Sequence, residues 1–235
     1  MRVHRCATPD EAARRAAVRF VLLATEAVQA RGVFRVALAG GSTPRALYEL
    51  LRDAALDWNR IEFFWGDERF VPAGDPRRNE SMARAALLDA IRAPHVFPMP
   101  AEGTPARAAE AYAARLPERF DLVLLGIGAD GHTASLFPGQ AAVLESVRTV
   151  LAARSPVAPH ERLTLSVACI NRARAVWFLV TGADKAAALS RVLHGPEDID
   201  ATPAQAVARY APLVELFADV SALGEAPGDR SPFPG

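Results

Sequence analysis

The segment from Phe120 to Gly139 constrains the fold of this chain more than any other. Its apolar run, Leu122 to Leu125, is typical of a buried strand, and the run opens into a glycine-rich turn at residues 126–131. Glycines at the carboxyl end of a strand let the backbone turn sharply and approach a ligand closely. In open α/β sheets that end of the strands is where ligands bind. The segment therefore predicts an α/β fold with a ligand site at this turn.

Apolar segments of strand length alternate with segments of helical periodicity along most of the chain. Strands are predicted at residues 34–39, 61–65, 122–125, 147–153, 163–168, 176–180 and 214–217. Helices are predicted at residues 9–31, 43–54, 79–91, 104–116 and 183–193. In the second helix the side chains expected to face the core are Leu47, Leu50, Leu51 and Ala54. This alternation indicates βαβ units and a mostly parallel sheet with helices on both faces.

The chain is predicted to form one domain. No linker rich in proline, serine or glycine divides residues 1–224, and no internal repeat occurs there. Residues 225–235 are rich in proline and glycine with little to bury, so they are predicted to be a flexible tail.

Charge and hydropathy exclude several classes of partner. The 27 Lys and Arg residues balance the 27 Asp and Glu residues, so no net positive field favours nucleic acid or an anionic membrane. The longest apolar runs have strand length, and the N-terminal segment lacks the apolar core of a secretory signal. The two cysteines have no evident partner, which fits a reducing compartment. The expectation is a soluble cytoplasmic protein, monomeric by default.

Asp130 and His132 stand two residues apart in the glycine turn. They suggest an acid–base site, because histidine titrates near neutrality. A lone histidine is often structural, but the place of His132 among glycines rather than on an apolar face argues against that interpretation. A metal site is disfavoured because the remaining candidate ligands show no paired spacing. These are His4, His95, His160, His194, Cys6 and Cys169.

The same turn also fits the glycine fingerprint of dinucleotide-binding proteins, with glycines at positions 126, 128 and 131. That fingerprint requires a long helix after the turn and a second strand that ends in an acidic residue. Here Pro138-Gly139 stops any helix within two turns, and no such strand follows. A nicotinamide or flavin site is therefore disfavoured.

A second candidate site follows the strand at 34–39, where the chain reads Gly40-Gly41-Ser42-Thr43-Pro44. Free backbone N–H groups, two hydroxyls and the positive end of a helix dipole make such a turn suitable for an anion. It is not a nucleotide P-loop, because the terminal Lys-Ser/Thr is missing. A plain tight turn with a Ser/Thr cap is the alternative interpretation.

Charged residues follow two further strands. Asp67, Glu68 and Arg69 come after the strand at 61–65, and a planar guanidinium suits phosphate, although a surface ion-pair cluster would look the same. Lys185 lies in the first turn of a helix, where the dipole disfavours a cation unless an anion is near. All these groups fall at the carboxyl ends of strands. Together they predict a pocket for a small phosphorylated molecule with acid–base chemistry beside it.

Five motifs carry a resemblance to a known family. GGSTP, GDERFVP, GIGADGHTASLFPG, RLTLS and VTGADKAAAL occur in the order and spacing of the 6-phosphogluconolactonase family, over about Pro9 to Leu223. The resemblance implies the Rossmann-like α/β fold that this family shares with glucosamine-6-phosphate deaminase. It also implies hydrolysis of 6-phospho-D-glucono-1,5-lactone to 6-phospho-D-gluconate, in the oxidative pentose phosphate pathway.

The deaminase is the nearest alternative. Its motif after the D-G-H turn supplies a further glutamate, whereas residues 133–138 of this chain contain no carboxylate. It also shows a D-E-Y type motif where this chain has Asp67-Glu68-Arg69. Both differences favour the lactonase, and a non-catalytic phosphosugar-binding protein is a third interpretation. The chain departs from the family pattern at Arg78, a change that could alter phosphate contacts near the site mouth, and at Thr202-Pro203.

The resemblance and the chemistry together assign expected roles. His132 is the expected general base that activates water, and Asp130 is expected to orient its imidazole. A lactone is an activated ester, so no covalent nucleophile, metal or cofactor is expected. Arg69 and Lys185 are expected to hold the 6-phosphate. The other expected substrate-binding residues are Gly40, Gly41, Ser42, Thr43, Asp67, Asn79, Gly128 and Gly131.

Overall fold

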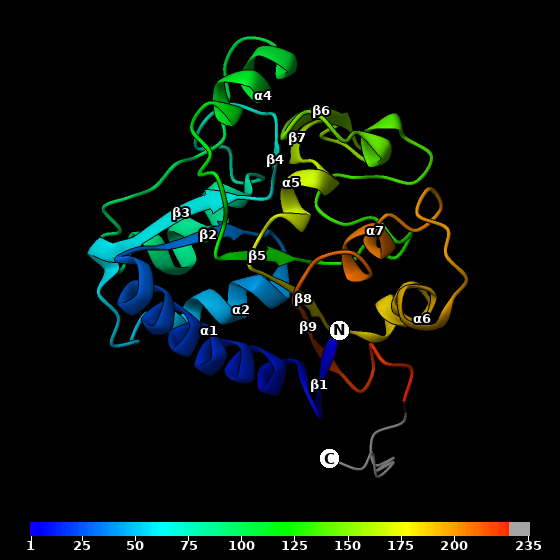
Figure 1. The fold of residues 1–235 in the computed structure, drawn as a ribbon, viewed down its shortest axis with the longest axis horizontal. Coiled ribbons are helices and arrows are strands. Elements are labelled where there is room, and N and C mark those ends of the chain that lie inside the picture. Colours follow the sequence, from blue (N-terminus) through cyan, green and yellow to red (C-terminus); the bar gives the residue numbers. More distant parts are fainter. Residues whose placement is uncertain (226–235) are drawn as a thin grey trace.

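Six parallel strands form the centre of the protein (Figure 1). Their order across the sheet is β1 (Arg2–Cys6), β9 (Val214–Asp219), β8 (Ala175–Val180), β5 (Leu122–Leu125), β2 (Phe34–Leu38) and β3 (Ile61–Trp65). Every pairing between neighbours is parallel. All residues of β5 and β8 are buried, because both faces of the sheet are covered, and this explains their continuous apolar sequences. The computed structural model describes residues 1–225, so the predicted tail lies, apart from Glu225, outside the described residues.

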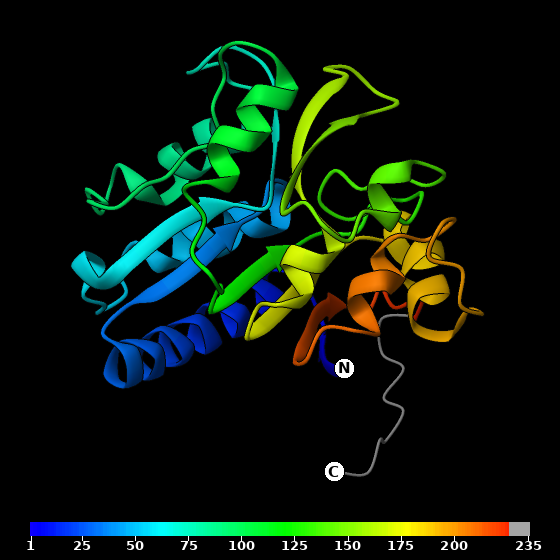
Figure 2. The same cartoon turned by 45° about the horizontal axis from the view of Figure 1, so that its top comes forward.

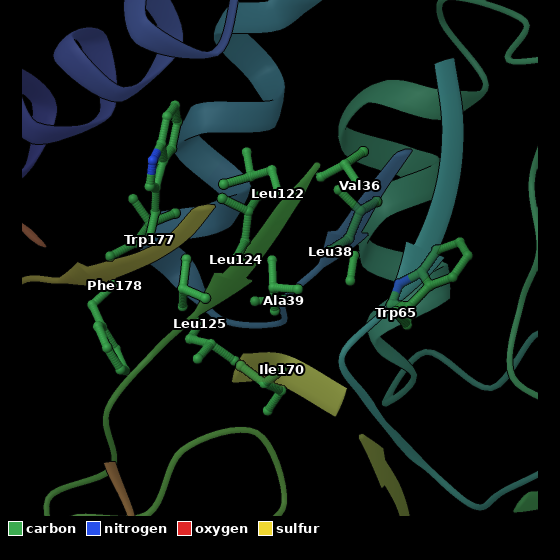
Figure 3. Packing of buried hydrophobic residues seen from close by; sticks show 14 of the residues in the cluster. Val36, Leu38, Ala39, Trp65, Leu122, Leu124, Leu125, Ile170, Trp177 and Phe178 are labelled. Atoms are coloured by element: carbon green, nitrogen blue, oxygen red, sulfur yellow. The ribbon is translucent and has the colours of Figure 1, made fainter. Parts of the chain in front are cut away.

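Helices cover one face of this sheet, and further helices with a second small sheet lie on the other (Figure 2). Helix α1 (Pro9–Arg31) contacts β1, β2 and β9 and runs beside α2 (Ser42–Leu51). The side chain of Thr8 caps the start of α1, and Gly32, with φ of 77°, ends it. The successive side chains of Trp177 and Phe178 point to opposite faces of the sheet, and Ile170 of α5 (Val167–Asn171) lies near Leu125 (Figure 3). The prediction of a mostly parallel sheet with helices on both faces is confirmed.

Three short strands form a second, antiparallel sheet in the order β4 (Asp67–Arg69), β7 (Glu161–Leu165) and β6 (Val150–Arg154). Only Gly66 separates β3 from β4, so the chain passes directly from the central sheet into the second one. Helix α4 (Pro105–Ala113) lies against β6 and β7. The second sheet therefore carries the DER segment to the rim of the central sheet, where the site lies.

The structure corrects several details of the predicted elements. Strand β1, strand β4, helix α5 and helix α7 (Ala204–Ala208) were not predicted, because they are short and, in β1, largely polar at an exposed sheet edge. The predicted helix at 79–91 is α3 (Asn79–Ala83) followed by a π-helical turn at 84–88. The predicted helix at 183–193 is a 3₁₀ turn followed by α6 (Ala186–His194).

One predicted core residue is wrong. Leu50 is 44% exposed, because the buried stripe of α2 runs through Pro44, Leu47, Tyr48 and Leu51 at helical spacing and leaves Leu50 at its margin. Among residues 1–225, the structure contains no helix with the length and apolarity needed to cross a membrane.

Candidate active site

A pocket of about 360 Å³ opens where β2, β3, β5 and β8 end. These four strands are neighbours in the parallel sheet, so the loops that follow them meet at one edge. The pocket is lined by ten of the twelve residues that the sequence singled out: Gly40, Gly41, Ser42, Thr43, Asp67, Arg69, Asn79, Gly128, His132 and Lys185. The other two, Asp130 and Gly131, lie in the turn that carries His132 and do not form part of the wall.

His132 is held by Asp130. The Nδ1 atom of His132 lies 2.6 Å from Oδ1 of Asp130, and the same oxygen accepts the backbone N–H of His132 at 3.1 Å. Burial raises the pKa of Asp130, but the hydrogen bonds and charge of His132 outweigh it, so its pKa lies below the ordinary value. The carboxylate therefore favours a proton on Nδ1, and Nε2 is left as the proton acceptor. The imidazole also lies against Phe137, with ring centroids 4.8 Å apart.

The turn after β5 places the imidazole against its own backbone. A Cβ atom built on Gly128 would lie 2.0 Å from Nδ1 of His132 and 2.6 Å from Oδ1 of Asp130, so the pair can keep this position only beside a glycine. The N–H of Gly128 donates to the carbonyl of His132 at 2.9 Å, which closes the turn. Gly131 has φ of 97° and faces Thr202, so its place in the sequence reflects the shape of this turn. The turn therefore fixes both the position and the direction of the His132 ring.

A second polar cluster lies across the pocket. Asp67 accepts hydrogen bonds from the Ser135 hydroxyl at 2.7 Å and from the Asn79 amide at 3.2 Å. Asn79 also lies so close to Gly40 that a Cβ atom there would be 2.0 Å from its Oδ1. The carboxylate of Asp67 thus has a fixed direction, set by Ser135 and Asn79 from two separate segments of the chain.

Beneath this cluster, the carboxylate of Glu68 is buried and accepts the backbone N–H groups of Arg69, Asn79 and Glu80 at 2.7–2.8 Å. Burial raises the pKa of Glu68, and these hydrogen bonds together with the charge of Arg78 act in the opposite direction. Glu68 therefore ties the start of α3 to β4, which fixes Asn79 and Arg69 relative to each other.

Replacing Glu68 with glutamine is expected to destabilise the protein by about 1–3 kcal/mol. Both carboxylate oxygens of Glu68 accept backbone N–H groups, and the amide NH₂ that replaces one of these oxygens is a donor and cannot accept them. For a chain of this length the melting temperature should fall by roughly 2–12 °C in a calorimetric scan. Glu49→Gln, in an exposed pair with Arg45, is the control and should change it little. An unchanged melting temperature in Glu68→Gln would contradict this role.

Arg78 does not lie at the site mouth, where the sequence had suggested an effect on phosphate contacts. It is 1% exposed and donates to the carbonyls of Val71 and Met99 at 3.1 and 2.7 Å, and its guanidinium lies 3.3 Å from Glu80. It forms no part of the pocket wall. Its long side chain reaches inward and joins the loop after β4 to the segment before α4, which a sequence motif alone does not reveal.

The start of α2 faces the pocket between these clusters. No side chain caps α2, and its first N–H groups have no acceptor within the helix. The hydroxyl of Thr43 forms a hydrogen bond of 2.7 Å with that of Thr181, which follows β8 and leads toward Lys185. Lys185 lies 3.1 Å from the exposed carboxylate of Asp184. Helix N–H groups, hydroxyls and an ammonium group thus share one part of the pocket, an arrangement suited to an anion.

Sequence reasoning missed three residues of the site. Thr181 and Ala134 line the pocket, and Ser135 holds Asp67. Ala134 has φ of 48°, a left-handed conformation that is uncommon for alanine. Both Ala134 and Ser135 follow His132 in the motif HTAS, so their closeness to the turn was the one available signal.

The fold and this pocket define an α/β protein with a hydrogen-bonded Asp–His pair and groups suited to an anion at the carboxyl edge of its sheet. Residues 7–214 match the sequence model of the family described as glucosamine-6-phosphate isomerases/6-phosphogluconolactonase. The chain belongs to this family.

Relatives cover nearly the full length of the domain. The chain is 40% identical to a 6-phosphogluconolactonase of Synechocystis sp., over 82% of this chain and 85% of the relative, and 41% identical to one of Mycobacterium leprae, over 86% and 89%. The solved structure of 6-phosphogluconolactonase from Trypanosoma brucei superposes with a TM-score of 0.87 at 33% identity and covers 95% of this chain and 97% of that one. A monomeric glucosamine-6-phosphate deaminase shares the fold, with a TM-score of 0.83 at 22% identity over 96% and 100%.

Proposed function

We propose that the protein hydrolyses 6-phospho-D-glucono-1,5-lactone to 6-phospho-D-gluconate, a step of the oxidative pentose phosphate pathway. The relatives with about 40% identity carry the name of this activity. The observation that carries the proposal is the His132–Asp130 pair, 2.6 Å apart, in a pocket that also presents Arg69 and Lys185. Acid–base groups suit the hydrolysis of an ester, and cations suit the phosphate of a sugar phosphate, so together they fit a phosphorylated sugar lactone.

His132 acts as the general base in this proposal. Its Nδ1 faces Asp130, so Nε2 accepts a proton from water as the oxygen of that water attacks C1 of the lactone. Backbone N–H groups of the glycine turns stabilise the oxyanion that forms on the carbonyl oxygen. The bond between C1 and the ring oxygen then breaks, and the imidazolium returns its proton to that oxygen. One water is consumed, and the product is the open-chain acid.

No covalent intermediate is part of this mechanism. Cys6 and Cys169 are both buried, and burial raises the pKa of each thiol to about 11, so neither supplies a thiolate. The Ser135 hydroxyl donates to Asp67, and His132 is held by Asp130 rather than by a serine. Water is therefore the nucleophile that these contacts favour.

Arg69 and Lys185 hold the 6-phosphate in this proposal, with Gly41, Ser42 and Thr43 at the start of α2. Gly40 and Gly128 allow Asn79 and His132 to approach closely, Gly131 shapes the turn, and Asp67 with Asn79 orients the sugar hydroxyls.

Replacing Arg69 or Lys185 with methionine is expected to raise KM about 10- to 100-fold with little change in kcat, because each loses a charge-assisted contact made equally in substrate and transition state. Steady-state kinetics with the phosphorylated lactone measure this effect. Glucono-1,5-lactone, which lacks the phosphate, is the matched control substrate and should be hydrolysed as by wild type. A loss of kcat with KM unchanged would assign these residues to the chemical step instead.

The direct test is hydrolysis of freshly generated 6-phosphogluconolactone above its spontaneous rate. No acceleration would redirect attention to deamination of glucosamine 6-phosphate and then to binding of a phosphosugar without catalysis. The lactonase is preferred because residues 133–138 carry no carboxylate for ring opening by a deaminase.

The proposal includes no cofactor, metal or nucleic-acid partner and takes the protein as a monomer. Among residues 1–225 no group of three or more His, Cys, Asp or Glu side chains is placed to hold a metal ion. Two free, buried cysteines accord with the expected cytoplasmic location. The boundary of the domain at residue 224 stays a prediction.

A further inference from the structure

Arg162 in β7 is a buried cation that is 7% exposed. Within the described part of the chain, its Nε and Nη1 atoms have no hydrogen-bond partner. No ion pair with it occurs among residues 1–225 either, although arginine side chains are almost never buried unless they are paired. A buried guanidinium costs free energy unless hydrogen bonds or an opposite charge compensate it.

The pairing of β4 with β7 places Arg162 directly opposite Arg69. The N–H of Phe70 donates to the carbonyl of Glu161, and the N–H of Leu165 donates to that of Gly66, so the pairs at Phe70 and Gly66 are hydrogen-bonded. Hydrogen-bonded and non-hydrogen-bonded pairs alternate along an antiparallel ladder, so the pair at Glu68 is hydrogen-bonded as well. Arg69 and Arg162 therefore form a non-hydrogen-bonded pair, the kind in which opposite side chains come closest. Both side chains leave the ladder on the same face.

That face is the one that adjoins the pocket. Asp67, two residues before Arg69 and hence on the same face, lines the pocket, as Arg69 does. Opposite Asp67, the hydroxyl of Thr164 accepts the N–H of Ser135, which belongs to the loop after His132. Arg162 thus lies one strand away from the pocket wall, beside Arg69.

Among residues 1–225, no carboxylate forms an ion pair with Arg69 or Arg162. Asp67 is hydrogen-bonded to Ser135 and Asn79, and Glu68, on the opposite face, is occupied by backbone N–H groups. Burial, and then the charge of Arg69, lower the pKa of Arg162, while Asp67 and Glu68 act in the opposite direction. Arg69 donates one hydrogen bond, from Nη1, to the carbonyl of Arg77. Its other guanidinium N–H groups remain for contacts with a ligand. Two like charges directly opposite each other destabilise a sheet, so an anion bound between them would stabilise this pairing.

We propose that Arg162 is a further phosphate-binding residue, which with Arg69 forms a pair of guanidinium groups that holds the 6-phosphate of the substrate. This inference rests on the proposed function. Two planar donor arrays on one face suit the several oxygens of a phosphate dianion, and the anion relieves the repulsion between them. Arg162 then discriminates between phosphorylated and unphosphorylated lactones, and Lys185 with the start of α2 contacts the phosphate from the other side.

The test is Arg162→Met, which keeps the long apolar stem and removes the charge. Titration calorimetry with 6-phosphogluconate should show binding on the order of tenfold to a hundredfold weaker than in wild type, and KM for the phosphorylated lactone should rise while kcat is largely kept. Binding of gluconate and hydrolysis of glucono-1,5-lactone should not change. In phosphate-free buffer the variant should melt at the same temperature as wild type or higher, because an unpaired buried charge is gone.

Arg154→Met is the matched control, since it removes one exposed arginine from β6 of the same sheet and should bind 6-phosphogluconate as wild type does. If Arg162→Met also binds it as wild type does, or if it melts lower and loses phosphorylated and unphosphorylated ligands alike, Arg162 has a structural role and the inference is wrong. A wild type that neither binds 6-phosphogluconate nor hydrolyses the lactone would instead overturn the proposed function.

A second measurement does not depend on any variant folding. In crystals of wild type with 6-phosphogluconate, a guanidinium nitrogen of Arg162 should lie within about 3.2 Å of a phosphate oxygen. A phosphate held by Lys185 and α2 alone, with Arg162 still without a partner, would overturn the inference.

Discussion

Replacing His132 with alanine is expected to lower kcat by about 10²–10⁴-fold, the contribution typical of a well-placed general base. Its imidazole is the group that Asp130 holds in the pocket at 2.6 Å, and the side chain is 32% exposed, so its loss leaves no large buried cavity. KM and the affinity for 6-phosphogluconate should change little, since the phosphate contacts lie elsewhere. The measurement is steady-state hydrolysis of fresh 6-phosphogluconolactone, with the spontaneous rate subtracted.

His194→Gln is the control for this experiment, because His194 is exposed at the end of α6, outside the pocket. It should hydrolyse the lactone as wild type does. Full turnover by His132→Ala would show that water is activated by another group, and Asp67 would then be the next carboxylate to test because it lines the same pocket.

Replacing Gly128 with alanine is expected to lower kcat by about 10²-fold or more without unfolding the protein. The added methyl group would lie 2.0 Å from Nδ1 of His132 and 2.6 Å from Oδ1 of Asp130, so the pair cannot keep its position. The backbone of Gly128 does not have a positive φ, so alanine brings no backbone strain, and the partly exposed imidazole turns toward solvent. Misplacement of a catalytic group by about 1 Å already costs on the order of 10²-fold.

Gly126→Ala adds the same methyl group to the same turn and serves as the comparison. A Cβ atom on Gly126 meets nothing within 4 Å, so kcat should stay near that of wild type, and any contact with substrate appears in KM. Thermal melting curves should be similar for both variants. If Gly128→Ala kept full kcat, the position of the His132–Asp130 pair would not matter for catalysis, and the proposed mechanism would be wrong.

Much of the central sheet could be predicted from the sequence because its signals are local. The strand at 122–125 and the one at 176–180 are apolar throughout, which reports burial on both faces, and glycine turns mark where they end. Short or edge elements gave no such signal: β1 is largely polar and exposed, and β4 has only three residues. Their existence depends on pairing with strands far away in the chain.

The candidate site divides in the same way. In a parallel sheet the carboxyl ends of all strands lie on one edge, so polar residues that follow the strands lie close together there. Ten of the twelve predicted residues therefore line one pocket. What each of them touches could not be predicted. Arg78 was expected near the site mouth and is buried beneath it, because its partners are carbonyls in two other segments.

The alternation of strands and helices, the glycine turns and the kinds of chemical group at each strand end follow from the sequence, because they depend on residues close together in the chain. Which strands are neighbours, and so which groups meet, follows only from the tertiary structure. It joins Ser135 to Asp67 across 68 residues and sets Arg162 opposite Arg69 in a separate antiparallel sheet. Strand order and register arise from long-range pairing and burial, and no local pattern encodes them.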